Sequence, residues 1–188
     1  MDWREFVPDT TDLPPLSHFQ DAGFPTRMLH TSKQMCEGSP SWAVAERWWS
    51  ELDQHLKVPR GLAIWNSTPK ALETLCLVTL RLSFWRYLPV PRGIRVAPAM
   101  YVEAMDLNDD DVAIRAREAG TLLVAGTGAV MYGADRTLEV LSSLAQIRLR
   151  QGNLTLWHLS PAATDRSEEV CRKLVKVLGD STIEVGRP

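Results

Sequence analysis

The sequence predicts a three-layer α/β fold with a mainly parallel sheet of five strands. Short apolar segments of strand composition alternate with helical segments along most of the chain, and parallel strands require such crossover connections because both faces of their sheet must be covered. At 188 residues the chain has the length of one domain with a substantial core. No internal repeat or low-complexity tract interrupts the alternation.

An extended arm is expected to precede the α/β domain. Residues 1–38 are rich in Pro, Asp, Thr and Ser with scattered aromatic residues, and residues 39–188 form the domain itself. Capping serines and Pro40 open the first helix in "SPSWAVAERWWSELDQHL". Its apolar residues at helical spacing are Trp42, Ala45, Trp49 and Leu52.

Strands and helices then follow in turn. A strand at 61–65 leads through a turn into a helix that starts at Pro69 and reaches about Tyr87, where "PVPRG" breaks it. The remaining strands are expected at 93–98, 121–126, 153–159 and 181–185, and the remaining helices at 99–107, 109–120, 136–150 and 165–178. The segment 121–126 is apolar on both faces, as a strand covered by helices on both sides should be.

The composition excludes several classes of protein. A net charge of -2 and a pI of about 6.1 give no strong overall attraction to nucleic acid or to an anionic membrane. The three cysteines, Cys36, Cys76 and Cys171, lack the spacing of a zinc site, which indicates a reducing compartment. The N-terminal segment has no apolar run, and no segment is long and apolar enough to span a membrane. We therefore expect a cytoplasmic protein without a metal.

The order of several short sequence segments narrows the predicted α/β layout to one kind of fold. "AERWWSEL" precedes "RGLAIW", "GIRVAPAMYVEAM" follows the second helix, and "AGTLLVAGTGA" supplies the third strand. "TLEVLSSLAQIRLRQGNLTLWHLSP" and "EEVCRKLVKV" then complete the chain. This order resembles the AAA+ ATPases of the DnaC and IstB type, the helicase loaders and transposition helper ATPases, over roughly residues 42–188. The resemblance implies a P-loop NTPase-like fold of the AAA+/RecA-like kind.

The phosphate loop that the resemblance implies has lost its chemistry. An active loop needs glycines whose backbone N-H groups wrap the phosphates, a lysine for the β and γ oxygens, and a Ser or Thr for magnesium. The matching stretch runs from Asn66 to Thr74, with Leu72 and Glu73 where the lysine and the hydroxyl belong. Lys70 is either a displaced phosphate ligand or a surface lysine.

Two further positions of the implied site have changed and one has survived. The third strand of such ATPases ends in acids that hold magnesium, but this chain has Ala125 and Gly126 there. His158 occupies the place of the polar sensor residue at the end of the fourth strand, where it either contacts a ligand or is satisfied by a backbone group. Arg172 matches the arginine that the family supplies to the nucleotide of a neighbouring subunit, although an arginine on a charged helix face is commonly just solvated.

A basic cluster offers the best contact for nucleic acid or for a partner. Arg81, Arg86, Arg92 and Arg95 are interleaved with aromatic residues, which is typical of a surface that follows a phosphate backbone with stacking support. The alternative is that these arginines complement helix ends and pair with surface acids.

These losses favour a non-catalytic AAA+-like adaptor, a pseudo-ATPase without a cofactor. Such a subunit would engage an active AAA+ ATPase, a helicase or another nucleic-acid-processing complex, in DNA replication or in a mobile element. The alternative is a small Rossmann-like α/β enzyme or ligand-binding domain whose likeness to the loaders is accidental.

Overall fold

The computed structural model describes the α/β domain from its first strand onward, with gaps. The described residues are 61–65, 93–96, 110–124, 133–159, 161 and 165–186, together with 43, 44, 47, 48, 51, 54, 55 and 58. The predicted arm at 1–38 and the predicted helices at 69–87 and 99–107 lie outside them.

Five strands form one parallel sheet in the order β2-β3-β4-β1-β5. Their bounds are β1 Gly61–Trp65, β2 Gly93–Val96, β3 Thr121–Val124, β4 Leu154–Leu159 and β5 Thr182–Val185. The predicted parallel sheet is confirmed, and each strand lies within the segment that the sequence indicated. β1, β3 and β4 are buried along their whole length, as expected for strands of a parallel sheet.

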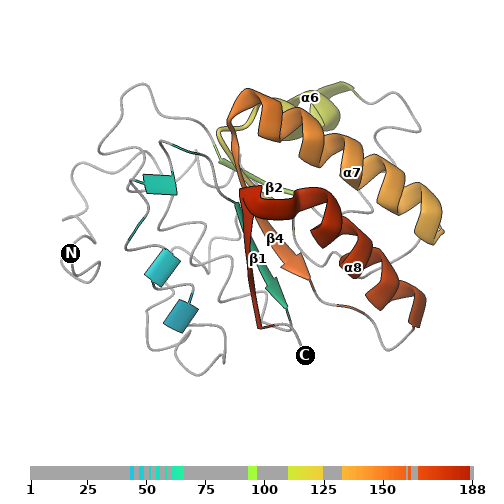
Figure 1. Ribbon diagram of the computed structural model, residues 1–188. Coiled ribbons are helices and arrows are strands. Elements are labelled where there is room, and N and C mark those ends of the chain that lie inside the picture. The colour runs from blue at the N-terminus through green and yellow to red at the C-terminus, as the bar shows by residue number, and fades with distance from the viewer. Residues whose placement is uncertain are drawn as a thin grey trace, which may run out of the picture.

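The three longest described helices pack together with one face of the sheet, as Figure 1 shows. They are α6 Asp110–Glu118, α7 Ala134–Gln151 and α8 Asp165–Leu178, and a short 3-10 turn, η5 Gly179–Ser181, leads into β5. α7 ends at Gly152 in the left-handed conformation (φ 73), and this terminus returns N-H groups to the last carbonyls of the helix. The predicted helix at 136–150 is thus confirmed and extends slightly further at both ends.

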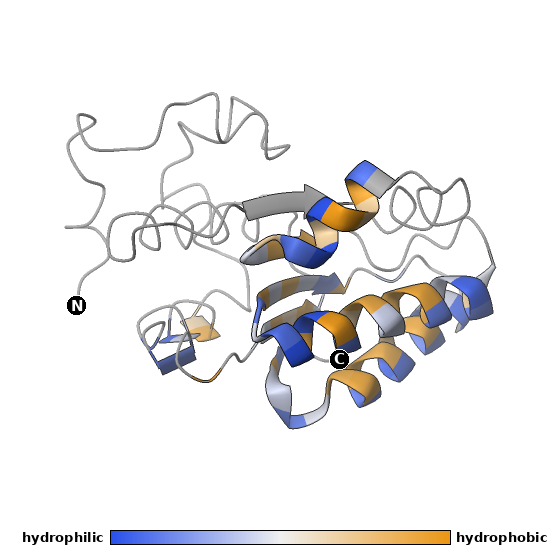
Figure 2. Cartoon of the chain, turned by 90° about the horizontal axis from the view of Figure 1, so that it is seen from above, coloured by the Kyte–Doolittle hydropathy of each residue, from blue (hydrophilic) through white to orange (hydrophobic). Residues whose placement is uncertain are grey.

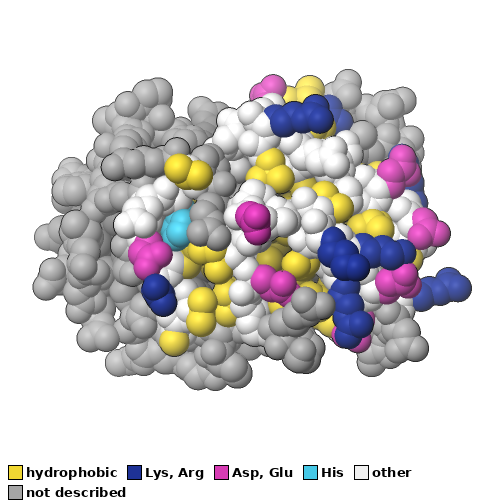
Figure 3. Space-filling view, viewed as in Figure 1, with side chains coloured by type: hydrophobic (Ala, Val, Ile, Leu, Met, Phe, Trp, Pro, Cys, Tyr) yellow, Lys and Arg dark blue, Asp and Glu magenta, His cyan; other side chains and the backbone are white. Residues whose placement is uncertain are grey.

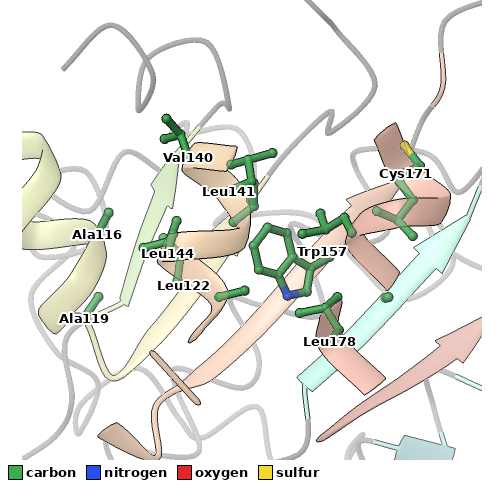
Figure 4. Packing of buried hydrophobic residues seen from close by; sticks show 14 of the residues in the cluster. Ala116, Ala119, Leu122, Val140, Leu141, Leu144, Trp157, Cys171 and Leu178 are labelled. Atoms are coloured by element: carbon green, nitrogen blue, oxygen red, sulfur yellow. The ribbon is translucent and has the colours of Figure 1, made fainter. Parts of the chain in front are cut away.

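Alternate residues of the strands build two buried layers. On the face below the helices, Ala63, Leu122 and Trp157 join one core with apolar side chains of α7 and α8 (Figure 4). α7 and α8 present these residues as stripes of apolar colour beside polar ones (Figure 2). The intervening residues of β1, β3 and β4 face the other way and are buried too.

The first predicted helix is described only in part. Backbone hydrogen bonds from Glu51 to Arg47 and from Val58 to Gln54 show helical turns there. Trp48 is buried and stacks on His55 with ring centroids 5.2 Å apart. The four apolar residues that the sequence analysis placed on this helix lie outside the described part.

Candidate functional site at the carboxyl edge of the sheet

Open parallel sheets bind their ligands at the carboxyl ends of the strands. In this chain the described ends of β1, β3 and β4 are Trp65, Val124 and Leu159, all at most 1% exposed. None of these three side chains offers an oxygen to a metal or a charge to a phosphate. The residues that follow β1 and β3 directly are the predicted site positions Asn66 and Ala125, which lie outside the described residues.

A polar contact ties β1 to β5 at this edge. The indole Nε1 of Trp65 donates a hydrogen bond of 2.6 Å to Oε1 of Glu184 on β5. Glu184 stands opposite Ala63 in the ladder between β1 and β5, so its side chain reaches along the sheet towards the carboxyl end of β1. The bond fixes the side chain of Trp65, the last residue of β1, against β5.

His158 is a buried residue of β4. It is paired with Ile64 of β1, one position before the strand ends, and it is 2% exposed. Its neighbours Trp157 and Leu159 belong to the core below α7 and α8, so alternation turns His158 to the opposite face of the sheet. His158 thus lies one residue before the end of β4, on the face of the sheet away from α7 and α8.

Arg172 lies on the exposed side of α8. Its guanidinium Nη2 bonds Oε1 of Glu168 one turn earlier, and Lys173 pairs in the same way with Glu169 at 2.7 Å. The hydrogen bond between this second pair lowers the pKa of the Glu169 carboxyl and raises the pKa of the Lys173 ammonium. Figure 3 shows basic side chains with acidic ones beside them over this part of the molecule.

Most of the other predicted site residues belong to parts of the chain that the structure does not describe. Lys70, Leu72, Glu73, Gly126, Arg81, Arg86 and Arg92 lie outside the described residues, with Asn66 and Ala125. The backbone of Arg95 lies within β2, opposite Leu123 of β3. Within the described part of the chain, no group of three His, Cys, Asp or Glu side chains could hold a metal ion.

A dense polar centre that was not predicted from the sequence lies at the opposite, amino edge of the sheet. Arg148 of α7 is 1% exposed, and its guanidinium lies between the end of α6 and the start of β4. A pattern could have revealed it, because Arg148 follows Leu141, Leu144 and Ala145 on the apolar stripe of α7. A charged residue in that position must be buried with hydrogen-bond partners or break the stripe.

Comparisons with known proteins agree with this architecture. No family model matches the chain, and no curated protein matches it. Among solved structures, it resembles DnaI with 12% identity, a TM-score of 0.56, and coverage of 88% of this chain and 93% of that one. A putative primosome component from Streptococcus pyogenes matches with 11% identity and a TM-score of 0.57, over 93% and 97% of the two chains.

A third similar structure is DnaA from Aquifex aeolicus with bound AMPPCP. It has 13% identity and a TM-score of 0.56, and the match covers 78% of this chain and 47% of that chain. In the described part of our chain, no helix has the length and apolar character needed to cross a membrane. The chain therefore has the α/β fold seen in DnaI and DnaA.

Proposed function

We propose that the chain is a non-catalytic AAA+-like subunit that joins an assembly acting on nucleic acid. The observation that carries this proposal is a fold shared with DnaI and DnaA in a chain whose phosphate loop contains Leu72 and Glu73 where lysine and a hydroxyl are needed. Its likeness to a putative primosome component supports a role in replication assembly.

Electrostatics supports the loss of nucleotide chemistry. A carboxylate at Glu73 would face the triphosphate from within the loop, and like charges a few ångströms apart in a partly desolvated pocket repel by several kcal/mol. Pro69 removes one backbone donor from the same loop. The carboxyl end of β3 supplies Ala125 and Gly126 in place of magnesium ligands, so charge neutralisation at the phosphates would fail as well.

The described part of the carboxyl edge supports the same proposal. The strand ends there are apolar, and the indole N-H of Trp65 is directed to Glu184 within the sheet. Glu184, one residue before the end of β5, accepts that N-H. The described strand ends of this edge therefore stabilise the fold and offer no cation to a nucleotide.

Calorimetry with ATP and magnesium tests the loss of nucleotide binding. We expect no saturable heat and no phosphate release from the purified chain. The double variant Leu72→Lys, Glu73→Thr is the matched control, and it should remain inactive because Ala125 and Gly126 still leave the metal unheld. Micromolar affinity together with turnover in the unaltered chain would contradict the proposal and favour the α/β enzyme class.

The partner is tested separately. Purification of the tagged chain from its native host, followed by mass spectrometry, should recover an ATPase, a helicase or another nucleic-acid-processing protein in a stable complex. Deletion of residues 1–30 should weaken that association and leave the core folded, because the arm's prolines and spaced aromatic residues suit a docking segment. Recovery of the chain alone would contradict the adaptor role.

The basic cluster decides whether nucleic acid is part of the assembly. Replacing Arg86 and Arg92 by Ala should reduce binding of a labelled oligonucleotide equally for all sequences, and it should lower the slope of the salt dependence by roughly one unit for each phosphate that is no longer neutralised. If the cluster instead contacts an acidic protein surface, the same change should slow association with the protein partner. We favour the second result because the net charge of -2 gives little non-specific attraction to nucleic acid.

A further inference from the structure

Helix α6 is bound to the core by small side chains. The residues that it contributes to the core are Ala113 and Ala116, followed by Ala119 just beyond its end, and its larger Ile114 is 43% exposed. α7 and α8 instead bury valine, leucine and cysteine side chains against the same sheet, as Figure 4 shows for Leu144, Cys171 and Leu178. Because apolar stabilisation scales with the area removed from water, α6 gains less from burial in this core of described residues than α7 and α8 do.

The C-terminal end of α6 has a different kind of attachment. The Nη1 atom of Arg148 donates to the carbonyl oxygens of Ala116 at 2.8 Å, Ala119 at 2.7 Å and Arg117 at 3.2 Å. The side-chain amide of Asn153 adds a hydrogen bond of 3.3 Å to the Arg117 carbonyl. Carbonyls in the last turn of a helix have no partner within the helix and carry the negative end of its dipole, so a cation is the group they favour.

The same guanidinium also holds the start of β4. Its Nε donates to Oγ1 of Thr155 at 2.8 Å, and its Nη2 donates to the carbonyl of Leu154 at 2.5 Å. Arg148 thereby joins the end of α6, its own helix α7 and the first residues of β4. All of these bonds are buried or partly buried, so water cannot readily replace them.

We propose that α6 is a hinged helix, with a fixed pivot at its C-terminal end and a movable N-terminal end. α6 leads directly into the start of β3, so its pivot lies at the amino edge of the sheet and its N-terminal end points to the carboxyl edge. In the described part of the chain, the N-terminal half of α6 contributes one side chain to the core, that of Ala113. A ligand or partner at the carboxyl edge can therefore displace it at small cost, while Arg148 keeps the rest of the core in place. This inference does not depend on the proposed function.

Amide hydrogen exchange measured by NMR tests the attachment. In the unaltered chain, the amides of Ile114 to Glu118 should exchange at least about tenfold faster than those of Leu144 and Leu174. Arg148→Met should accelerate exchange in α6 by a further factor of about ten, with a smaller change in α7 and α8. Arg150→Met is the matched control, because Arg150 is an exposed arginine in the last turn of the same helix, and it should leave α6 unchanged.

Distances between pairs of spin labels test the hinge itself. We expect a broader distribution for labels at Asp111 and Glu139, towards the carboxyl edge, than for labels at Glu118 and Arg150, towards the amino edge. Distributions of equal width would overturn the hinge. Exchange in the unaltered chain that is equally slow in α6, α7 and α8 would also overturn it, as would equal acceleration of all three helices by Arg148→Met. If Arg148→Met does not fold, the measurements on the unaltered chain still decide.

Discussion

The two edges of the sheet differ in where their polar groups lie. At the amino edge, a buried arginine, a threonine hydroxyl and an asparagine amide join α6, α7 and β4 through short hydrogen bonds. At the carboxyl edge, the described strand ends are apolar, and a bond between Trp65 and Glu184 joins β1 to β5. Ligands of open parallel sheets bind at the carboxyl edge, so the usual distribution of polar groups is reversed among the described residues.

This difference separates the requirements of the fold from the requirements of nucleotide chemistry. The layers, the strand order and the helix ends require packing and satisfied backbone groups, and the amino edge supplies both. Nucleotide chemistry requires lysine, hydroxyl and carboxylate groups at the carboxyl edge, and the proposed function rests on Leu72, Glu73, Ala125 and Gly126 standing at those positions. Under the proposed function, the fold serves as a platform for assembly without nucleotide chemistry.

The largest expected effect concerns the amino end of β1. A Cβ atom on Gly61 would lie 2.6 Å from the backbone oxygen of Thr155, and that oxygen belongs to a strand held in the ladder and so cannot give way. Gly61→Ala should therefore lower the free energy of unfolding by about 2 kcal/mol. Urea denaturation followed by tryptophan fluorescence measures this change. An unaltered midpoint would show that the amino edge is looser than its hydrogen bonds indicate.

The carboxyl end of the same strand should respond less. Trp65→Phe keeps most of the apolar ring but removes the donor to the Glu184 carboxylate, which costs about 1.5 kcal/mol. Since Glu184 is only partly buried, water can solvate its freed oxygen. Urea denaturation followed by circular dichroism avoids the loss of the tryptophan signal. A loss of unfolding free energy larger than that caused by Gly61→Ala would contradict the conclusion that the amino edge is the more tightly held of the two.

The sequence predicted the local structure far better than the contacts that hold it. Each strand is a short apolar run, and the pattern that predicts such a run depends only on neighbouring residues, so all five strands could be placed. The Trp65 and Glu184 pair spans 119 residues, and Arg148 reaches carbonyls 29 and 32 residues away. Every residue has a backbone carbonyl, so the sequence does not reveal which carbonyls a side chain will bond. Only the position of Arg148 on an apolar stripe could have indicated its burial.

Cys171 lies in the core between the two edges, and its thiol tests whether that core excludes water. Burial raises the pKa of the Cys171 thiol to about 12. The unfolded chain releases this proton near its ordinary pKa of 9.0 while the folded chain retains it, so stability is complete below pH 9 and falls as the pH rises towards 12. Relative to Cys171→Ala, the unaltered chain should lose about 1 kcal/mol between pH 8 and pH 10. Urea midpoints at the two pH values measure this, and parallel changes in both chains would contradict a dry core.

The smallest expected effect is at Arg172, on the surface of α8 beyond both edges. Its ion pair with Glu168 is exposed, and exposed pairs one helical turn apart contribute at most about 0.5 kcal/mol. Arg172→Gln should therefore change the urea midpoint no more than the matched control Arg136→Gln, whose arginine pairs with Glu139 on α7. Because stability is nearly unaffected, association can be read without interference from unfolding. If Arg172 is only a solvated side chain on α8, sedimentation of the complex with the purified partner should be the same for both variants. Weaker association of the Arg172 variant alone would instead show that this arginine reaches a neighbouring subunit, and it would place the functional contact on α8.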